Sequence, residues 1–148
     1  MQQIARAKSI VRAQPKIVFE AFVNPEMMRQ FWFHRKDHGF RVNESVMFYL
    51  GNEEDAFGFT AQVLNLIADS LIHLRWGDEN GWTEVKWILE ETETRDTALT
   101  IEESGFSGSD EEITDRVIDS TAGFNQVIVA AKALIEHGVA INVVTDHA

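Results

Sequence analysis

The spacing of apolar residues along this chain changes twice and divides it into three parts. From Phe40 to Glu103, short runs of alternating apolar and polar residues are separated by turn-forming residues, which is typical of half-buried β-strands. From Asp110 to His137, apolar residues recur at steps of three and four, which predicts one long amphipathic helix. Before this region, loose alternation over residues 4–11 predicts an edge strand.

The two prolines of the chain mark the starts of two short helices. Pro15 opens the first helix directly after the predicted edge strand. Asn24 followed by Pro25 combines a helix-capping residue with proline at the first helical position, and this pair predicts a second helix over residues 26–33.

The alternating region predicts an antiparallel meander. We expect strands at residues 40–43, 46–50, 57–67, 71–76, 83–91 and 97–103. The connections between them are short, whereas parallel pairing would need long crossovers. Counting the segment 4–11, the sequence predicts a sheet of six or seven strands, and the fold class is α+β. Alternation also predicts one apolar face opposite a face that meets water.

The long helix is expected to pack on the apolar face of the sheet. Ser109 and Asp110 can cap its start, Gly138 can end it, and a stripe that includes Phe124 and Ile128 follows one side. The same stripe could form a coiled coil, but a helix beside a one-sided sheet needs no second helix. The sequence therefore favours packing within the chain.

Length and composition predict one globular domain over residues 1–148, with the last ten residues as a tail. The chain has 45% hydrophobic and 25% charged residues, which are ordinary values. It has no cysteine, and this excludes disulfides, thiolate metal sites and thiol catalysis. The N-terminus lacks an apolar signal segment, and no apolar run approaches the roughly 20 residues of a membrane span. We therefore expect a cytoplasmic protein.

Charge is distributed unevenly, with a net value of −11. Residues 1–41 carry eight basic and three acidic side chains, whereas residues 42–148 carry five basic and twenty-one acidic ones. An acidic body repels nucleic acid and anionic lipid, so neither is an expected partner. The distribution fits solubility and attraction between the two parts of one fold. Alternatively, the basic N-terminal part docks an acidic partner.

Five motifs occur in the order found in a known family. They are residues 10–22, Asn24-Pro25-Glu26 with Phe31-Trp32, residues 84–90, residues 97–101 with Ser104-Gly105-Phe106, and Gly123-Phe124 where the family usually has Gly-Trp. The chain thereby resembles the homologues of the activator of the 90-kDa heat-shock protein ATPase, within the START and birch-pollen-allergen superfamily. The resemblance implies a helix-grip fold, in which a curved sheet holds the C-terminal helix with a cavity between them. The larger eukaryotic activators have a further N-terminal domain, and other superfamily members carry lipids, hormones and polyketides.

The polar clusters give no strong candidate for catalysis, a metal or a cofactor. His34 and His38 are spaced to share a helical face, but they have no third ligand and lie beside two basic residues. Acidic pairs and triplets, such as residues 53–55 and 110–112, fall in predicted turns or at a helix start. The glycine-rich segment 104–108 lacks the lysine of a phosphate-binding loop. We expect no metal, no cofactor and no catalytic residue.

The apolar interior is the remaining candidate site, either as a filled core or as a pocket. The expected ligand-binding residues are Phe48, Phe59, Trp76, Val85, Trp87, Leu99, Ile101, Thr121, Phe124 and Ile128. The leading hypothesis is non-enzymatic binding of a small hydrophobic or aromatic molecule. A protein–protein module related to the chaperone ATPase activators, with a chaperone or another protein as partner, is the second hypothesis. Under any hypothesis we expect a monomer or weak dimer. An enzyme of the cyclase or hydratase kind is the third.

Overall fold

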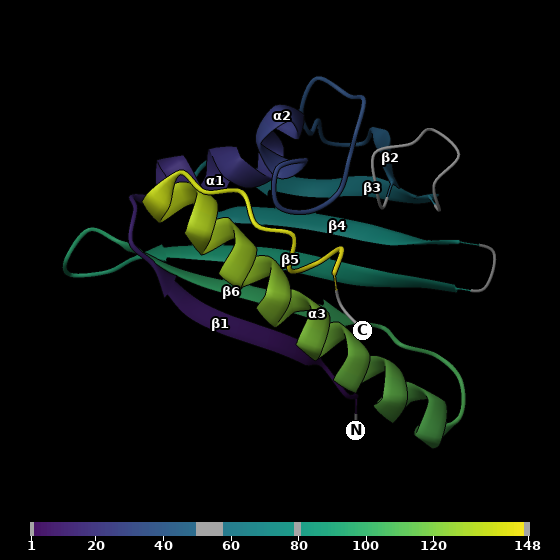
Figure 1. Cartoon of the computed structure of the whole chain (residues 1–148). Coiled ribbons are helices and arrows are strands. Elements are labelled where there is room, and N and C mark those ends of the chain that lie inside the picture. Colours follow the sequence, from purple (N-terminus) through teal and green to yellow (C-terminus); the bar gives the residue numbers. More distant parts are fainter. Residues whose placement is uncertain (1, 50–57, 79–80, 147–148) are drawn as a thin grey trace.

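The computed structural model describes residues 2–49, 58–78 and 81–146. A curved antiparallel sheet carries a long helix that runs obliquely across one of its faces, and two short helices lie beside this helix on the same face (Figure 1). In chain order the elements are β1 (Ala5–Val11), α1 (Pro15–Val23), α2 (Pro25–Met28), β2 (Ser45–Tyr49), β3 (Gly58–Ile67), β4 (Leu71–Asp78), β5 (Gly81–Glu91), β6 (Thr97–Ser104) and α3 (Asp110–His137). This arrangement confirms the helix-grip α+β fold.

The sheet has the strand order β1-β6-β5-β4-β3-β2, and every neighbouring pair is antiparallel. Strands β2 to β6 form the predicted meander. The first strand returns to pair with the last, so that Ala5 lies opposite Glu103 and Val11 opposite Thr97. A register shift between Val63 and Asn65 interrupts the pairing of β3 with β4.

The strand predicted at residues 40–43 is wrong, and the sheet has six strands. The amide of Glu44 donates to the carbonyl of Arg41 at 3.1 Å, which closes a turn. Asn43 has a φ of 71°, a left-handed conformation that cannot continue a strand. The predicted turn at residues 51–55 and the middle of the turn at 78–81 lie outside the described residues.

The second helix is shorter than the sequence predicts. It ends at Met28 rather than near Phe33, because the chain then turns inward and buries Phe31 and Trp32 in the core. The side chain of Asn24 accepts a hydrogen bond from the amide of Glu26, as expected of a helix cap. Tertiary burial of the two aromatic residues therefore overrides the local helical pattern.

Buried Arg35 anchors the loop after α2. Its guanidinium donates to the carbonyls of Phe22 at 3.2 Å and Val23 at 2.8 Å, at the end of α1. It also pairs with Asp37 at 3.0 Å and lies 3.9 Å from the centroid of the Phe40 ring. Burial lowers the pKa of Arg35 to about 10, although the charge of Asp37 acts in the opposite direction.

Helix α3 has both predicted ends. Ser109 and Glu112 form a reciprocal capping box, and Gly138 adopts the left-handed conformation, with a φ of 67°, that ends the helix. Its buried residues are all in the C-terminal half, beginning at Phe124. The first turns of the helix extend past the start of β1 (Figure 1). None of the described helices is long and apolar enough to cross a membrane.

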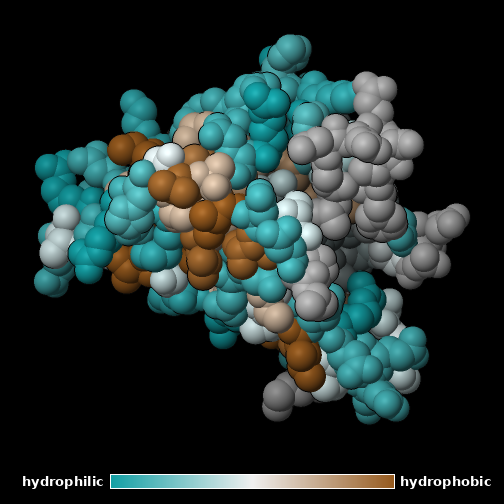
Figure 2. All heavy atoms as spheres, in the orientation of Figure 1, coloured by the Kyte–Doolittle hydropathy of each residue, from teal (hydrophilic) through white to brown (hydrophobic). Residues whose placement is uncertain are grey.

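The segment after α3 folds back over the molecule. Residues 139–146, expected as a tail, have no regular secondary structure, yet Ile141, Val143 and Val144 pack against the core. Figure 2 shows hydrophobic atoms gathered over the C-terminal half of α3 and this segment, on a face that is otherwise mostly hydrophilic.

Candidate functional site

A cavity of about 640 Å³ lies between the N-terminal half of α3 and the ends of β4 and β5 that meet at their hairpin. Its volume is in the range of small-molecule sites. Residues of β3, β6 and the loop after α2 complete its wall, together with Val144 of the C-terminal segment. The cavity thus forms where the helix no longer packs closely on the sheet.

Small residues on α3 keep the helix side of the cavity open. Ser120 and Gly123 line the cavity, and they are three residues apart on the same side of the helix. A Cβ atom at Gly123 would meet no other heavy atom within 4 Å. The helix therefore leaves space at a position where most residues would project a side chain.

Aromatic rings form one wall of the cavity around Trp76. The rings of Trp76 and Phe124 are stacked at 24°, with 6.3 Å between their centroids, and connect β4 to α3. Trp32 and Phe59 meet Trp76 edge to face, with centroid separations of 6.0 Å and 5.3 Å. Such a wall offers both ring faces and ring edges to a ligand.

The floor of the cavity carries a buried carboxyl group. Glu103, on β6, is only 5% exposed and lines the cavity. Its Oε2 accepts a hydrogen bond from Thr83 Oγ1 at 2.5 Å and another from Trp76 Nε1 at 3.1 Å. Trp76 and Thr83 are cross-strand partners, so adjacent strands bring the two donors to the same oxygen.

The sequence analysis missed Glu103 and Thr83, although a signal was present. Alternation from Leu99 and Ile101 places Glu103 on the inward face of β6, and alternation from Val85 places Thr83 inward on β5. Among the strand residues, only apolar ones were assigned to the site, and Thr121 of the helix was the single polar residue included. The signal was a polar residue at a position where the alternation of the strand places an inward-facing residue.

Charged residues surround the opening, and four of those in the described lining are acidic. They are Asp78, Asp115, Asp119 and the deeper Glu103, against the single guanidinium of Arg116. Arg116 lies 5.2 Å from the centroid of the Phe106 ring. The cavity therefore combines an aromatic wall with an excess of carboxyl groups.

Three of the ten expected ligand-binding residues line the cavity, namely Phe59, Trp76 and Phe124. Thr121 is half-buried outside the lining and donates its hydroxyl to the carbonyl of Val117 within the helix. Six are buried in the core outside the lining: Phe48, Val85, Trp87, Leu99, Ile101 and Ile128.

The two histidines considered for metal binding do not share a helical face. Helix α2 ends at Met28, and His34 instead makes backbone hydrogen bonds with Tyr49 in an isolated β-bridge. Within residues 2–49, 58–78 and 81–146, no three His, Asp or Glu side chains gather in a group that could hold a metal ion. The acidic cluster at 53–55 lies outside the described residues.

Several solved structures have the same fold. Protein SSP2350 from Staphylococcus saprophyticus is 25% identical with a TM-score of 0.76, and the alignment covers 94% of this chain and 96% of that one. DynU16, a putative protein in the dynemicin biosynthetic locus, is 20% identical with a TM-score of 0.79, over 93% of this chain and 48% of that one. The Aha1 dimer from Colwellia psychrerythraea is 17% identical with a TM-score of 0.75, over 92% and 98%.

No curated protein matches the sequence. The profile of one protein family, described as Activator of Hsp90 ATPase homolog 1-like protein, matches residues 12–136, which is most of the chain. The extent of the profile match and the shared fold lead to one conclusion: the chain belongs to the family of Activator of Hsp90 ATPase homolog 1-like proteins.

Proposed function

We propose that this protein binds a small molecule with an aromatic or apolar body in the cavity between α3 and the sheet. The observation that carries the proposal is the stacked pair of Trp76 and Phe124 in the wall of a 640 Å³ cavity. A ring in this cavity would contact the aromatic wall and leave water, and both effects favour binding.

The lining supports binding better than turnover. Glu103 holds two neutral donors on one oxygen, and no histidine or lysine is among the described residues that line the cavity. General acid–base chemistry needs a second positioned group near the first. The other polar side chains among these residues carry carboxyl groups, hydroxyl groups, indole N–H groups and one guanidinium.

A variant that fills the cavity tests the proposal. Gly123→Phe places a ring in the open space beside α3, whereas Ala122→Phe places the same ring at the exposed neighbouring position. Both variants are checked for folding by circular dichroism and then titrated with naphthalene derivatives while NMR follows the indole N–H of Trp76. We expect saturable shifts in the wild type and in Ala122→Phe, and none in Gly123→Phe. Absence of binding to the wild type, or unchanged binding to Gly123→Phe, would contradict the proposal.

A second candidate function is self-association through the outer side of α3. Ile118 is 63% exposed and Val129 is 53% exposed, and their spacing of eleven residues puts them on one side of the helix. The Aha1 protein from Colwellia psychrerythraea, which has this fold, was solved as a dimer. Sedimentation of the wild type and of Ile118→Ser with Val129→Ser tests this candidate. A dimer that the two substitutions disrupt would support it, and a monomer at all concentrations would exclude it.

A further inference from the structure

The carboxyl group on the cavity floor has one oxygen left for a ligand. Glu103 is more than nine-tenths buried, and both of its hydrogen bonds in the described structure are made by Oε2. Among the described residues, none donates a hydrogen bond to Oε1. Because Glu103 lines the cavity, a ligand there that carries a donor could form a hydrogen bond with this oxygen, and hydrogen bonds to a carboxylate are stronger than those between neutral groups.

The donors already present show what Glu103 accepts. The indole N–H of Trp76 can only donate, and Thr83 Oγ1 donates to the same atom, so Oε2 acts as an acceptor for both neutral groups. No basic side chain is paired with this carboxyl group within the described residues. A cation would therefore find a buried carboxyl group that the protein itself does not neutralise.

The wall beside Glu103 also favours a cation. Trp76 lies next to the carboxyl group through its own hydrogen bond, and its ring is stacked on Phe124. The faces of tryptophan and phenylalanine attract cations that approach within about 6 Å of the ring centroid. An aromatic or apolar ligand body and a cationic group could thus both be accommodated in this cavity.

The charges at the opening act in the same direction. Asp115 and Asp119 are exposed on the cavity side of α3, and Arg116 is the only basic residue in the described lining. Carboxyl groups around an opening raise the local concentration of cations and repel anions, an effect that salt screens. The carboxyl groups at the opening and the carboxyl group on the floor therefore both favour a cationic ligand.

We infer that the cavity selects molecules that carry a cationic nitrogen on an aromatic or apolar body, with Glu103 Oε1 as the acceptor for that nitrogen. This inference rests on the proposed function and names the class of ligand. It gives Glu103 and Trp76 separate roles: the carboxyl group recognises the charge, and the ring wall recognises the body.

Three compounds of similar size and different charge test the inference. Naphthylethylamine is cationic, naphthylethanol is neutral and naphthylacetate is anionic at neutral pH. Each is titrated into the wild type, Glu103→Gln and Glu102→Gln while NMR follows the indole N–H of Trp76. Glu102 is the neighbouring residue on β6 and pairs with Arg6 on the opposite face, so its variant changes the net charge equally without altering the cavity.

We expect the amine to bind the wild type at least about 10-fold more tightly than the alcohol, and the acetate to bind most weakly. Glu103→Gln should lower the affinity for the amine about 10-fold and leave that for the alcohol nearly unchanged, whereas Glu102→Gln should alter neither. If Glu103→Gln does not fold, the double variant Asp115→Asn with Asp119→Asn is used, because both positions are exposed. It should weaken amine binding several-fold at low salt and little at high salt.

The possible failures are distinguishable. If none of the three compounds binds, both the proposed function and this inference are wrong. If the alcohol or the acetate binds at least as tightly as the amine, the cavity binds ligands but this inference is wrong. The inference is also wrong if Glu103→Gln and Glu102→Gln weaken amine binding equally, or if the rim variant leaves amine binding at low salt unchanged.

Discussion

The indole nitrogen of Trp76 donates a hydrogen bond to Glu103 Oε2 at 3.1 Å, and this contact joins β4 to β6 across β5. Thr83, on the intervening strand, donates to the same oxygen. A single carboxylate oxygen therefore ties three strands together beneath the cavity. The carboxyl group of Glu103, which we propose as the acceptor for a ligand, therefore also holds together the strands that form the floor of the cavity.

Removal of the hydroxyl donor should weaken this arrangement. Thr83→Val keeps the shape of the side chain but, among the described residues, leaves Trp76 as the only donor to Glu103 Oε2. We expect a loss of about 1–3 kcal/mol in the free energy of unfolding, measured by urea titration. Thr94→Val, in an exposed turn, should cost much less. Equal losses for the two variants would show that the hydroxyl of Thr83 has no special role.

Phe124 should be less important for stability than an aromatic residue of the closed core. Phe124 borders the cavity, whereas Phe22 is fully buried among Phe31, Trp32 and Trp87. Phe22→Ala should cost the roughly 3–5 kcal/mol typical of a packed phenylalanine, and Phe124→Ala should cost less. Phe124→Ala should also alter the affinity for ligands. A loss as large as that of Phe22→Ala, without a change in binding, would show that Phe124 is an ordinary core residue.

Two glycines that line the cavity should respond to alanine in opposite ways. A Cβ atom at Gly77 would lie 2.1 Å from the carbonyl oxygen of Gly81, so Gly77→Ala should destabilise the protein by about 1–3 kcal/mol or more. Gly123 lies within α3 and has open space, so Gly123→Ala should stabilise it by roughly 0.5–1 kcal/mol. Thermal unfolding of both variants measures the difference. Destabilisation by Gly123→Ala would show that its surroundings are not open.

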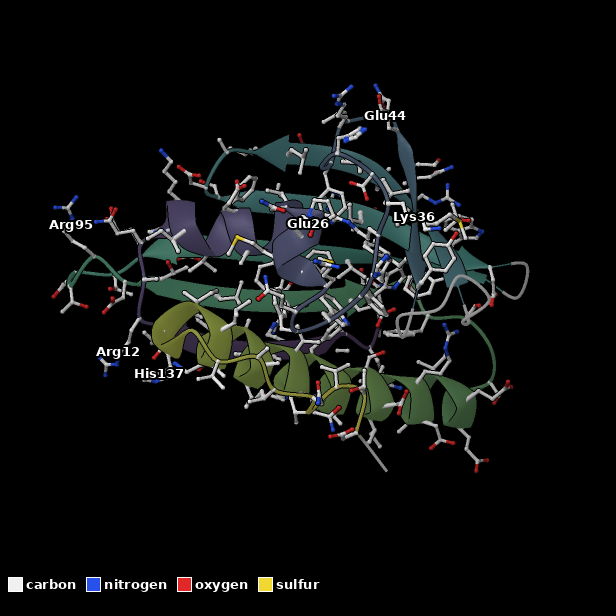
Figure 3. The ribbon with its side chains drawn as sticks, turned by 45° about the horizontal axis from the view of Figure 1, so that its top comes forward. Arg12, Glu26, Lys36, Glu44, Arg95 and His137 are labelled. Atoms are coloured by element: carbon white, nitrogen blue, oxygen red, sulfur yellow. The ribbon has the colours of Figure 1, made fainter. Side chains whose placement is uncertain are left out.

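Glu136 should make stability depend on acid pH. Burial tends to raise its pKa, but hydrogen bonds from Lys132 and the amide of Arg12, with nearby positive charge, together lower it below 4.5. A lowered folded-state pKa stabilises the fold above the unfolded-state value, and this stabilisation is lost as pH falls through the folded-state pKa. Arg12 and His137 lie at the same end of the molecule, where β1 and α3 both end (Figure 3).

Urea titrations of the wild type and Glu136→Gln, at pH values above and below 4.5, measure this effect. The wild type should be more stable than Glu136→Gln at neutral pH, and the difference should shrink in acid. Glu93→Gln, in an exposed turn, is the control with the same charge change. A difference that stays constant with pH would exclude the carboxylate of Glu136 as its source.

Regular elements with strong local signals were predictable from the sequence. The ends of α3 follow from Ser109 and Gly138, whose capping geometries are local properties of the chain. Strict alternation identified β4, β5 and β6 and their buried face. The errors at residues 40–43 and at the end of α2 have a different origin. The backbone of Asn43 and Glu44 bonds to Val63, and Trp32 is buried in the core, and both are tertiary contacts.

The position of the cavity could not be read from the apolar stripe of α3. Val117 and Ile128 belong to the same stripe, but only Ile128 lies where the helix packs closely on the sheet. The crossing angle and the reach of the helix beyond β1 decide which part of the stripe is covered (Figure 1). Thr83 and Glu103 were within reach of sequence reasoning, because they are in phase with the inward residues of their strands.

The pairing of β1 with β6 has a consequence for how the chain acquires its structure. Ala5 meets Glu103 and Val11 meets Thr97, so these contacts close a very long loop. Loop closure over such a separation slows folding, whereas the β3-to-β6 meander can form from local hairpins. During synthesis, β1 has no pairing partner until β6 has left the ribosome. Until then its backbone groups are unpaired, which is the condition under which a strand can pair with a neighbouring chain.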